Sequence, residues 1–497
     1  MNARDDAVVA ESREKETAEQ RRDGGDDDKA ARVVPVASES SREEQRQTSR
    51  EDYSDGPIND ATVRHANAIS ASAAEFLSLD AADSVLVLVL YRLPVLAERD
   101  SKSGAWRFKW DDDAIYLTSA GLKAALEANR RVVWVGILNS VSEVCESECA
   151  SIARTLASDF SCIPVFLPRA TLIRFYTGFC KGVLWPLFHM TSSVPTEAGA
   201  RQVFDRGLWQ TYTTVNRAFS DVVVSVYQGD TTSIWIHDYH LLLLPLQLRR
   251  RLTGAKIGFY LHTPWPSSDV YRTLPVRDEI LRSVLSVTVL GFNLFDYARH
   301  FISCCTRLLD LEHIMRNGNI IMNYCNRRVV IRVSHIGIDP ARFDRALSCS
   351  PFSSSPHTHA TTENKDGDAK ADDIDDAAEG GGDDNDDEQG TARLVALEVE
   401  RIRARVGEHR RIVCAIDDLD VIKGLPFKLL AMEQLLINFP AYRDQLVLYQ
   451  VANPRGVPRA EPLRAEIYEI VDRINEDFGS EDYAPVVYIE GRLSLVE

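Results

Sequence analysis

The sequence predicts an α/β protein with two successive doubly wound lobes, the second of which is incomplete. Two observations lead to this class. From residue 84 onward, short apolar strands alternate with amphipathic helices, a pattern typical of a parallel sheet covered by helices on both faces. After an interruption at residues 350–391 the same pattern begins again. It then offers only three strands before Glu497, whereas a doubly wound lobe usually has about five or six.

The first lobe is predicted over residues 84–345. Its candidate strands are residues 84–90, 131–137, 163–167, 233–237, 256–261, 287–292 and 329–336. One intervening helix is especially clear, because Val276, Ile280, Leu281, Val284 and Leu285 recur at helical spacing and share one face.

The second lobe is predicted over residues 395–497, with candidate strands at 411–416, 446–451 and 485–489. The helix after its first strand has Pro426 in its first turn, where the missing N–H of proline does no harm. The buried face of this helix is expected to hold Leu425, Leu429, Met432 and Leu436, and that of the next helix Leu463, Ile467, Ile470, Val471, Ile474 and Phe478.

The net charge of −17 is concentrated in two segments. Residues 1–60 carry 10 Lys/Arg against 17 Asp/Glu, and residues 361–390 carry 2 against 13. Neither segment has enough apolar surface to offset the entropy lost on ordering the chain. We therefore predict a disordered acidic tail over residues 1–60 and a disordered acidic insertion over residues 350–391. The rest of the chain is nearly neutral, which argues against a nucleic-acid partner.

The location predicted from the sequence is cytoplasmic. The N-terminus lacks the apolar core of a secretory signal, and no segment approaches the ~20 apolar residues of a membrane span, so no membrane partner is expected. The odd number of cysteines, nine, favours reduced thiols. Cys145 and Cys149 lie one helical turn apart, but no second Cys/His pair has matching spacing, so a metal site there is the weaker interpretation.

Polar side chains follow directly after two of the predicted strands. Asp238, Tyr239 and His240 come after the strand that ends at His237, and His262 follows the next strand. In open α/β sheets, ligands bind at the carboxyl ends of strands, where a carboxylate can accept hydrogen bonds from sugar hydroxyls. Asp238 could equally serve as a helix N-cap, and His262 as a structural histidine. A zinc site formed by His237, Asp238 and His240 is a further alternative, although its spacing is unusual for zinc.

Several long segments resemble the trehalose-6-phosphate synthase family, glycosyltransferase family 20. They are IWIHDYHLLLLPLQLR, IGFYLHTPWPSSDVYRTLPVRDEILRSVL, GFNLFDYARHFISCC, SHIGIDPARF, CIPVFLP with FYTGFCKGVLWPLFH, and DLDVIKGLPFKLLAMEQLL. The resemblance covers roughly residues 84–345 and 395–490. It is strongest to the plant-type members in which a synthase region precedes a phosphatase-like region, especially their less active class.

The resemblance implies a GT-B fold, in which the active site lies between two Rossmann-like lobes. It implies transfer of glucose from UDP-glucose to glucose 6-phosphate with retention at the anomeric carbon, giving trehalose 6-phosphate and UDP. No metal ion or cofactor is expected, and UDP-glucose enters as the donor substrate. The implied partners are these sugar-phosphate and nucleotide-sugar substrates and other synthase-family subunits. Catalysis in such a site rests on positioning and on electrostatic stabilisation of the departing diphosphate.

The resemblance also predicts the site residues one by one. The catalytic candidates are His262 and Asp238; the acceptor-binding candidates are Arg92, Tyr176, Trp185, Asp238, Tyr239 and Arg455; the donor-binding candidates are Lys423 and His262. Arg92 would hold the sugar phosphate through two parallel hydrogen bonds, and Lys423 would hold the donor diphosphate.

Other positions depart from the family pattern. Tyr91 replaces an Asn beside Arg92, and Asp418 replaces an Arg that binds the donor diphosphate, which puts a negative charge where a phosphate belongs. The paired glycines after the first strand are missing, since residues 111–122 contain only Gly121, and the family's R-D-G-M-N donor motif does not occur in the chain. The alternative is therefore a catalytically impaired member that binds a sugar phosphate or a partner and acts as a regulator.

Overall fold

The computed structural model describes residue 77 and residues 84–191, 204–340, 397–454 and 460–491, with short gaps inside the first two of these ranges. The predicted acidic tail and acidic insertion lie outside the described residues, so both stay predictions. The described residues build two separate sheets, each packed against helices.

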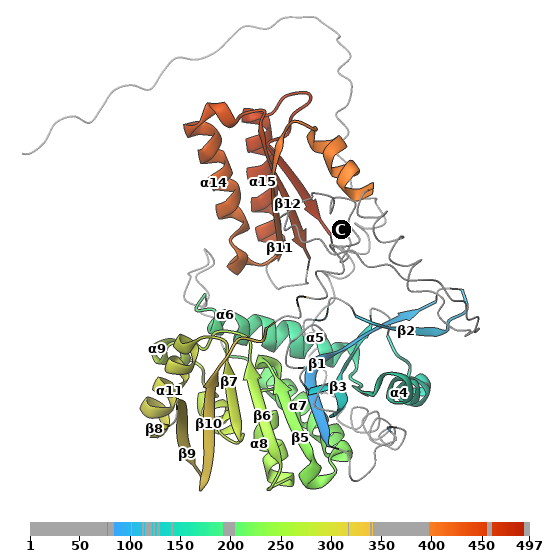
Figure 1. The fold of residues 1–497 in the computed structure, drawn as a ribbon, viewed down its shortest axis with the longest axis vertical. Coiled ribbons are helices and arrows are strands. Elements are labelled where there is room, and N and C mark those ends of the chain that lie inside the picture. Colours follow the sequence, from blue (N-terminus) through green and yellow to red (C-terminus); the bar gives the residue numbers. More distant parts are fainter. Residues whose placement is uncertain are drawn as a thin grey trace, which may run out of the picture. The chain divides into compact units, whose positions relative to one another are not determined.

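Ten strands form the first sheet (Figure 1). They are β1 (Val85–Arg99), β2 (Trp106–Trp110), β3 (Arg131–Ser140), β4 (Cys162–Val165), β5 (Thr232–His237), β6 (Lys256–Leu261), β7 (Val289–Phe292), β8 (His313–Arg316), β9 (Asn319–Tyr324) and β10 (Arg327–Val333). The strands β4, β3, β1, β5, β6, β7 and β10 lie side by side in this order and are parallel. The strands β9 and β8 continue the sheet in antiparallel fashion, and β2 pairs antiparallel with β1. The predicted α/β class with a parallel-dominated sheet is confirmed.

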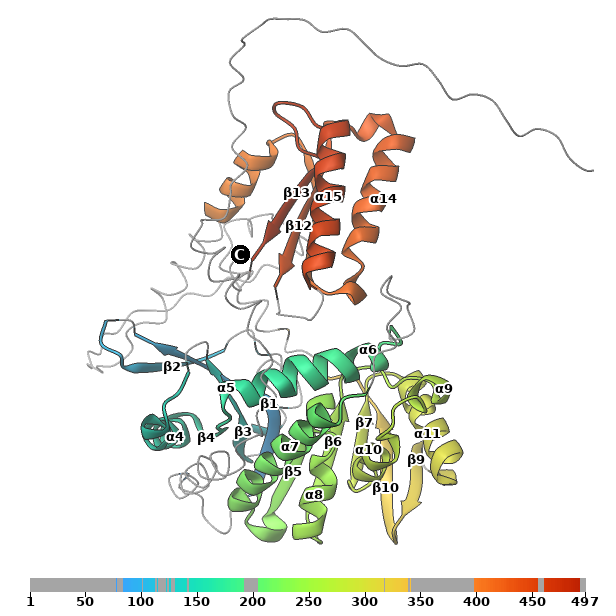
Figure 2. The ribbon, with the colours of Figure 1, turned by 180° about the vertical axis from the view of Figure 1, so that it is seen from behind.

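Helices connect these strands and cover the sheet. They are α4 (Glu146–Phe160), α5 (Arg169–Ile173), the π-helix η2 (Arg174–Leu184), α6 (Trp185–Phe188), α7 (Arg206–Val226), α8 (Leu244–Arg251), α9 (Ser268–Tyr271), α10 (Arg277–Val284) and α11 (Phe295–Leu309), with short 3-10 turns η3 (Gly229–Thr231) and η4 (Tyr239–Leu241). Figure 2 shows α7, α8 and α10 in front of the strands, on one face of the sheet. Among the described helices, none is both long enough and apolar enough to cross a membrane.

The central strands of the first sheet are buried on both faces. Residues 85–90 of β1 are all buried, although successive side chains point to opposite faces of the sheet. The predicted buried face of α10 is confirmed as well, since the side chains of Val276, Ile280, Leu281, Val284 and Leu285 are all buried.

The strands β2, β8 and β9 escaped prediction, and β1 is longer than expected. The side chains of β2 are half-buried or exposed, and those of β8 are exposed throughout, so neither segment has the apolar run that marks a buried strand. The strand β1 continues past its predicted end because residues 95–99 pair with β2. The prediction of strand residues up to 336 was also too long, since β10 ends at Val333.

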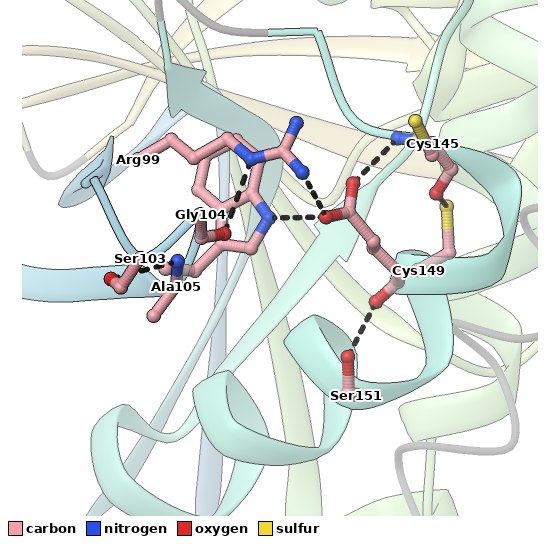
Figure 3. A network of polar contacts seen from close by, with 9 residues as sticks. Arg99, Ser103, Gly104, Ala105, Cys145, Cys149 and Ser151 are labelled. Carbon is pink, nitrogen blue, oxygen red and sulfur yellow. Dashed lines mark hydrogen bonds and ion pairs between the residues drawn. The ribbon is translucent and has the colours of Figure 1, made fainter. Parts of the chain in front are cut away.

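One carboxylate fixes the β1–β2 hairpin to the first turn of α4 (Figure 3). Glu148 accepts hydrogen bonds from the guanidinium of Arg99 at 3.0 Å, from the indole Nε1 of Trp106 at 3.2 Å and from the backbone N–H of Cys145 at 3.0 Å. The thiol of Cys149 donates to the carbonyl of Cys145 at 3.5 Å, and the described cysteines are all free thiols. Cys145 and Cys149 therefore have structural contacts within the first turn of α4, and Glu148 between them makes the contact with the hairpin.

The second sheet has three parallel strands among the described residues, in the order β11 (Arg411–Asp418), β12 (Leu446–Asn453) and β13 (Val486–Glu490). The 3-10 turn η5 (Val421–Lys423) and the helix α14 (Leu425–Asn438) follow β11, the turn η6 (Pro440–Tyr442) precedes β12, and the helix α15 (Ala460–Phe478) follows β12. The helices α14 and α15 lie side by side and bury their predicted apolar faces against one face of the sheet (Figure 1). Helical residues 397–406 pack on the other face through Val406.

Candidate functional site

The candidate site lies where the strand order of the first sheet changes direction. The strand β1 pairs in parallel with β3 on one side and with β5 on the other. The last pair in the register of β1 and β5 is Val89 with Ile236, and just beyond it the chain carries Tyr91 and Arg92 from β1 and Asp238 after β5. In doubly wound sheets, ligands bind in the crevice outside the strand ends at such a switch point.

The strand β1 is bent where it carries Arg92. Its register against β3 shifts on both sides of this residue. Gly136 of β3 permits the bend, because a Cβ at this position would lie only 2.8 Å from the backbone nitrogen of Leu93. The guanidinium of Arg92 is exposed and donates to Oδ1 of Asn139 at 3.4 Å. The bend thus places a cation at the edge of the switch point.

Tyr176 and Lys181 reach the site from the π-helix η2, and Trp185 reaches it from the first position of α6, directly after η2. The backbone N–H of Trp185 donates to the carbonyl of Cys180, five residues earlier, which is the spacing that defines a π-helix. This spacing corresponds to about 4.4 residues per turn, so residues nine positions apart come to the same face after about two turns. In an α-helix, with about 3.6 residues per turn, Tyr176 and Trp185 would lie on opposite faces.

Three rings of the site are nearly parallel. The ring centroid of Tyr91 lies 4.8 Å from that of Tyr176 and 4.5 Å from that of His240, with angles of 5° and 9° between the ring planes. The guanidinium carbon of Arg92 lies 5.3 Å from the centroid of Tyr91 and 5.9 Å from that of Tyr176. These cation–π contacts orient the exposed Arg92 at the site.

A second cation, Lys181, is buried in the same site, with only 8% of its surface exposed. Its Nζ lies 3.4 Å from the ring centroid of Trp185, whose ring in turn lies 5.6 Å from that of Tyr239. After burial, the positive charge of Lys181 is the largest cause that lowers the pKa of His240. Sequence analysis missed Lys181, although it is the one charge in the apolar segment 179–189, and such a lone charge was the available signal.

Asp238 has a strained backbone and a buried carboxylate. Its φ of 69° and ψ of 171° fall in a region used almost only by glycine, which costs another residue roughly 1–3 kcal/mol. The carboxylate accepts the backbone N–H of His262 at 3.3 Å and makes no capping hydrogen bond to the turn η4, so it does not act as the alternative N-cap. Burial raises the pKa of Asp238 to about 6, while the nearby backbone N–H groups of Tyr239, His262 and Thr263 oppose this shift by favouring the charged form.

A buried histidine, His237, and a half-buried one, His262, face each other across β5 and β6. Nδ1 of His237 and Nε2 of His262 are 3.0 Å apart. Burial lowers the pKa of His262 to about 4 and that of His237 well below its ordinary value, so both rings are neutral at pH 7. His240 is neutral for the same reason, and its 3.8 Å separation from Asp238 is not an ion pair. No set of three His, Cys, Asp or Glu side chains among the described residues is arranged to hold a metal ion, which leaves the zinc alternative without support.

Four buried polar atoms of this region make no hydrogen bond within the described part of the chain. They are the hydroxyl of Tyr91, Nε1 of Trp185, Nδ1 of His240 and Oγ1 of Thr263. Buried polar groups are nearly always hydrogen-bonded, and each exception costs about 1–3 kcal/mol. Their presence near the ends of β1, β5 and β6 and at the start of α6 indicates a region shaped to bind a polar molecule.

The carboxyl end of β11, in the second sheet, is acidic. Asp418 is the last residue of this strand and accepts a hydrogen bond from Nδ2 of Asn453 at 3.3 Å. The preceding Asp417 forms an ion pair with Lys428. Lys423, at the end of η5, is the predicted diphosphate-binding residue of this sheet. A carboxylate therefore occupies the strand end where the resemblance expects an Arg.

Comparison with known proteins decides the family. The model for glycosyltransferase family 20 matches residues 84–362 and 387–497, which is most of the chain. The chain belongs to glycosyltransferase family 20. The resemblance to this family, predicted from the sequence segments, is confirmed. The predicted GT-B class is confirmed as well, because solved structures of the family share the fold.

Curated members of family 20 give the same result. "Probable alpha,alpha-trehalose-phosphate synthase [UDP-forming] 10" of Arabidopsis thaliana is 38% identical over 406 residues, which are 81% of this chain and 41% of the relative. "Alpha,alpha-trehalose-phosphate synthase [UDP-forming] A" of Dictyostelium discoideum is 34% identical over 406 residues, 81% of this chain and 46% of the relative. The chain thus spans less than half the length of these relatives.

Solved structures of family 20 share the fold. The Candida albicans trehalose-6-phosphate phosphatase N-terminal domain aligns with a TM-score of 0.62 at 25% identity, covering 83% of this chain and 75% of that one. A Burkholderia xenovorans alpha,alpha-trehalose-phosphate synthase (UDP-forming) in complex with glucose-6-phosphate aligns with a TM-score of 0.57 at 20% identity, with the same coverage. At 20% identity, the second match is evidence of fold alone.

The structure brings together most of the predicted site residues of this family 20 chain. Those that converge on the switch point of the first sheet are Arg92, Tyr176, Trp185, Asp238, Tyr239 and His262. Lys423 belongs to the second sheet, and Arg455 lies outside the described residues, as does most of the segment 111–122. The binding and catalytic roles of all these residues stay predictions.

Proposed function

We propose that this chain is a trehalose-6-phosphate synthase-type retaining glucosyltransferase of trehalose biosynthesis. In this proposal it transfers glucose from UDP-glucose to glucose 6-phosphate and releases UDP. The observation that carries the proposal is the joint placement of Arg92, Lys181 and Asp238 with parallel aromatic rings at the switch point of the first sheet.

Each part of this arrangement suits a sugar phosphate. The guanidinium of Arg92 can hold a phosphate through two parallel hydrogen bonds, and Lys181 adds a buried positive charge nearby. Asp238 can accept hydrogen bonds from sugar hydroxyls, and the unpaired donors at Trp185 and Tyr91 can satisfy further ligand oxygens. Solved relatives are described with glucose-6-phosphate and with UDP-2-fluoro glucose bound, which supports the same substrate classes here.

Catalysis by these residues would be electrostatic. The proposal assigns His262 and Asp238 to the reacting sugar, where a fixed neutral imidazole and a buried carboxylate orient hydroxyl groups. Lys423 would stabilise the negative charge that develops on the departing diphosphate. Neither step requires a metal ion or a cofactor.

One observation favours a second candidate function, a family member with impaired catalysis that binds a sugar phosphate and regulates. Asp418 places a carboxylate at the end of β11, and it is held there by Asn453. Two like charges ~4 Å apart repel by about 4 kcal/mol at an effective dielectric constant near 20. Lys423 would have to offset this repulsion, since Lys428 is engaged by Asp417.

The deciding experiment is the transfer of labelled glucose from UDP-glucose to glucose 6-phosphate by the purified chain, with binding of glucose 6-phosphate measured in parallel by calorimetry. Trehalose 6-phosphate formed with many turnovers would support the synthase. Binding of glucose 6-phosphate without transfer would support the regulator. Absence of both would contradict the sugar-phosphate assignment itself. A cytoplasmic location and assembly with other synthase-family subunits remain predictions from the sequence.

A further inference from the structure

His237 and His262 form a hydrogen-bonded pair of rings at the ends of two neighbouring strands. His237 is the last residue of β5, and its register partner on β6 is Tyr260, two residues before His262. The Nδ1–Nε2 distance is 3.0 Å, and the ring planes are inclined by 24° with centroids 5.3 Å apart. The resemblance assigns a role to His262 but none to His237.

The main chain of His262 is fixed on both sides. Its N–H donates to Oδ1 of Asp238 at 3.3 Å, and its carbonyl accepts a hydrogen bond from Nδ2 of Asn293 at 3.0 Å. Asn293 is itself close to the hydroxyl of Tyr260, whose single proton is shared between two acceptors, Oδ1 of Asn293 and the carbonyl of Ser334 at 2.6 Å. With the backbone held, the remaining freedom of His262 is rotation of its side chain, and the contact with His237 restricts this rotation.

The shared hydrogen bond also links the protonation of the two rings. A neutral imidazole carries one proton, so one ring donates and the other accepts. If Nδ1 of His237 donates, His262 carries its proton on Nδ1; if Nε2 of His262 donates, Nδ1 of His262 is an acceptor. In both cases Nε2 of His262 is engaged by His237, and any further contact of the His262 ring is made through Nδ1.

We propose that His237 is a positioning residue that fixes the rotamer of His262 and links the tautomer of His262 to its own, so that Nδ1 of His262 is the ring atom presented to a sugar substrate. The substrate part of this inference rests on the proposed function. The effect on the ring of His262 exists in the free protein and does not depend on it. This is the usual way in which a second polar group determines which nitrogen of a histidine meets a ligand.

The test is ¹⁵N NMR of the full chain with selectively labelled histidine, with the His262 resonances assigned through His262→Gln. We expect one tautomer for His262 in the parent protein. His237→Leu removes the hydrogen bond, and the two ring ¹⁵N shifts of His262 should move toward the values of a solvent-like tautomer mixture. His237→Asn places an amide where Nδ1 of the imidazole was, and should return the shifts toward those of the parent. His313→Leu, in the exposed strand β8, is the matched control and should leave them unchanged.

Unchanged His262 shifts in folded His237→Leu would overturn the proposal. Should this variant fail to fold, His237→Asn and His237→Gln decide in its place, since Gln carries its amide one bond farther from the backbone. Equal His262 shifts in these two variants would then overturn it. Glucose 6-phosphate added to the same samples tests the proposed function separately, because a spectrum that does not respond removes the sugar-phosphate assignment and leaves the pairing result intact.

Discussion

Asp238→Asn should change how the stability of the protein depends on pH. Folding raises the pKa of Asp238 from an ordinary 3.8 to about 6, mainly through burial. A raised folded-state pKa means that ionisation of this carboxylate destabilises the fold. The penalty is absent below about pH 3.8 and complete above about pH 6, where it amounts to about 3 kcal/mol.

Between pH 4.5 and 7.5 this linkage corresponds to a change of about 2 kcal/mol in the free energy of unfolding. Asn does not titrate, so the free energy of unfolding of Asp238→Asn minus that of the parent should increase by this amount between pH 4.5 and 7.5. A change in stability that the amide itself causes is the same at every pH and does not affect this increase. Urea unfolding at several pH values, followed by tryptophan fluorescence, measures the difference. Asp159→Asn, at an exposed position of α4, provides the reference for a solvent-facing carboxylate. A stability difference between parent and Asp238→Asn that stays constant with pH would refute the reasoning.

Three further outcomes are expected. Lys181→Met should weaken glucose 6-phosphate binding by about 10-fold or more in calorimetry without abolishing folding, because a hydrogen bond to a charged group contributes about 1.5–3 kcal/mol; unchanged affinity would remove Lys181 from the site. Asp418→Arg should increase the affinity for UDP at least about 10-fold, since it replaces a repulsive charge with an attractive one; equal affinities of parent and variant would contradict the electrostatic argument. Arg249→Met should lower the free energy of unfolding by about 3 kcal/mol or more, because buried Arg249 donates to the carbonyl of Ser286 at 3.0 Å and to three other backbone carbonyls; a loss below about 1 kcal/mol would show that water replaces these bonds.

Much of the fold was predictable because buried parallel strands leave a simple pattern. The segments that became β5, β6 and β12 are short apolar runs, and their predicted positions agree with the structure to within two residues at each end. The antiparallel strands β2 and β8 were not predictable from such runs, because exposed strands are set by pairing with a neighbour and not by burial.

The strand β11 shows a different limit. Its apolar sequence predicts a strand buried on both faces, yet Val413 and Ile416 are 46% and 60% exposed. Among the described strands, β11 has a neighbour on one side only. An apolar sequence therefore shows that a strand is able to be buried, but it does not show whether another element covers it.

Site residues that directly follow a strand were predictable, whereas contacts between residues far apart in the sequence were not. Asp238 and His262 were found because they directly follow β5 and β6. The stacking of Tyr91 on His240, and the engagement of His262 by His237, depend on the order of strands in the sheet, which a single sequence does not reveal. Lys181 was not predicted because α-helical periodicity, at about 100° per residue, separates it from Tyr176 by about 140°, whereas the wider turn of η2 brings the two closer to one face.

Because η2 is wound as a π-helix, the number of its residues matters more for the geometry of the site than their identity. A substitution in this helix changes one side chain, whereas deletion of one residue between Tyr176 and Trp185 would turn the two ends relative to each other by roughly 80–100°. The nine-residue spacing between Tyr176 and Trp185 therefore determines how their two rings are oriented relative to each other. A designed variant that keeps every named side chain but shortens η2 by one position would retain the side chains of the site and lose their alignment.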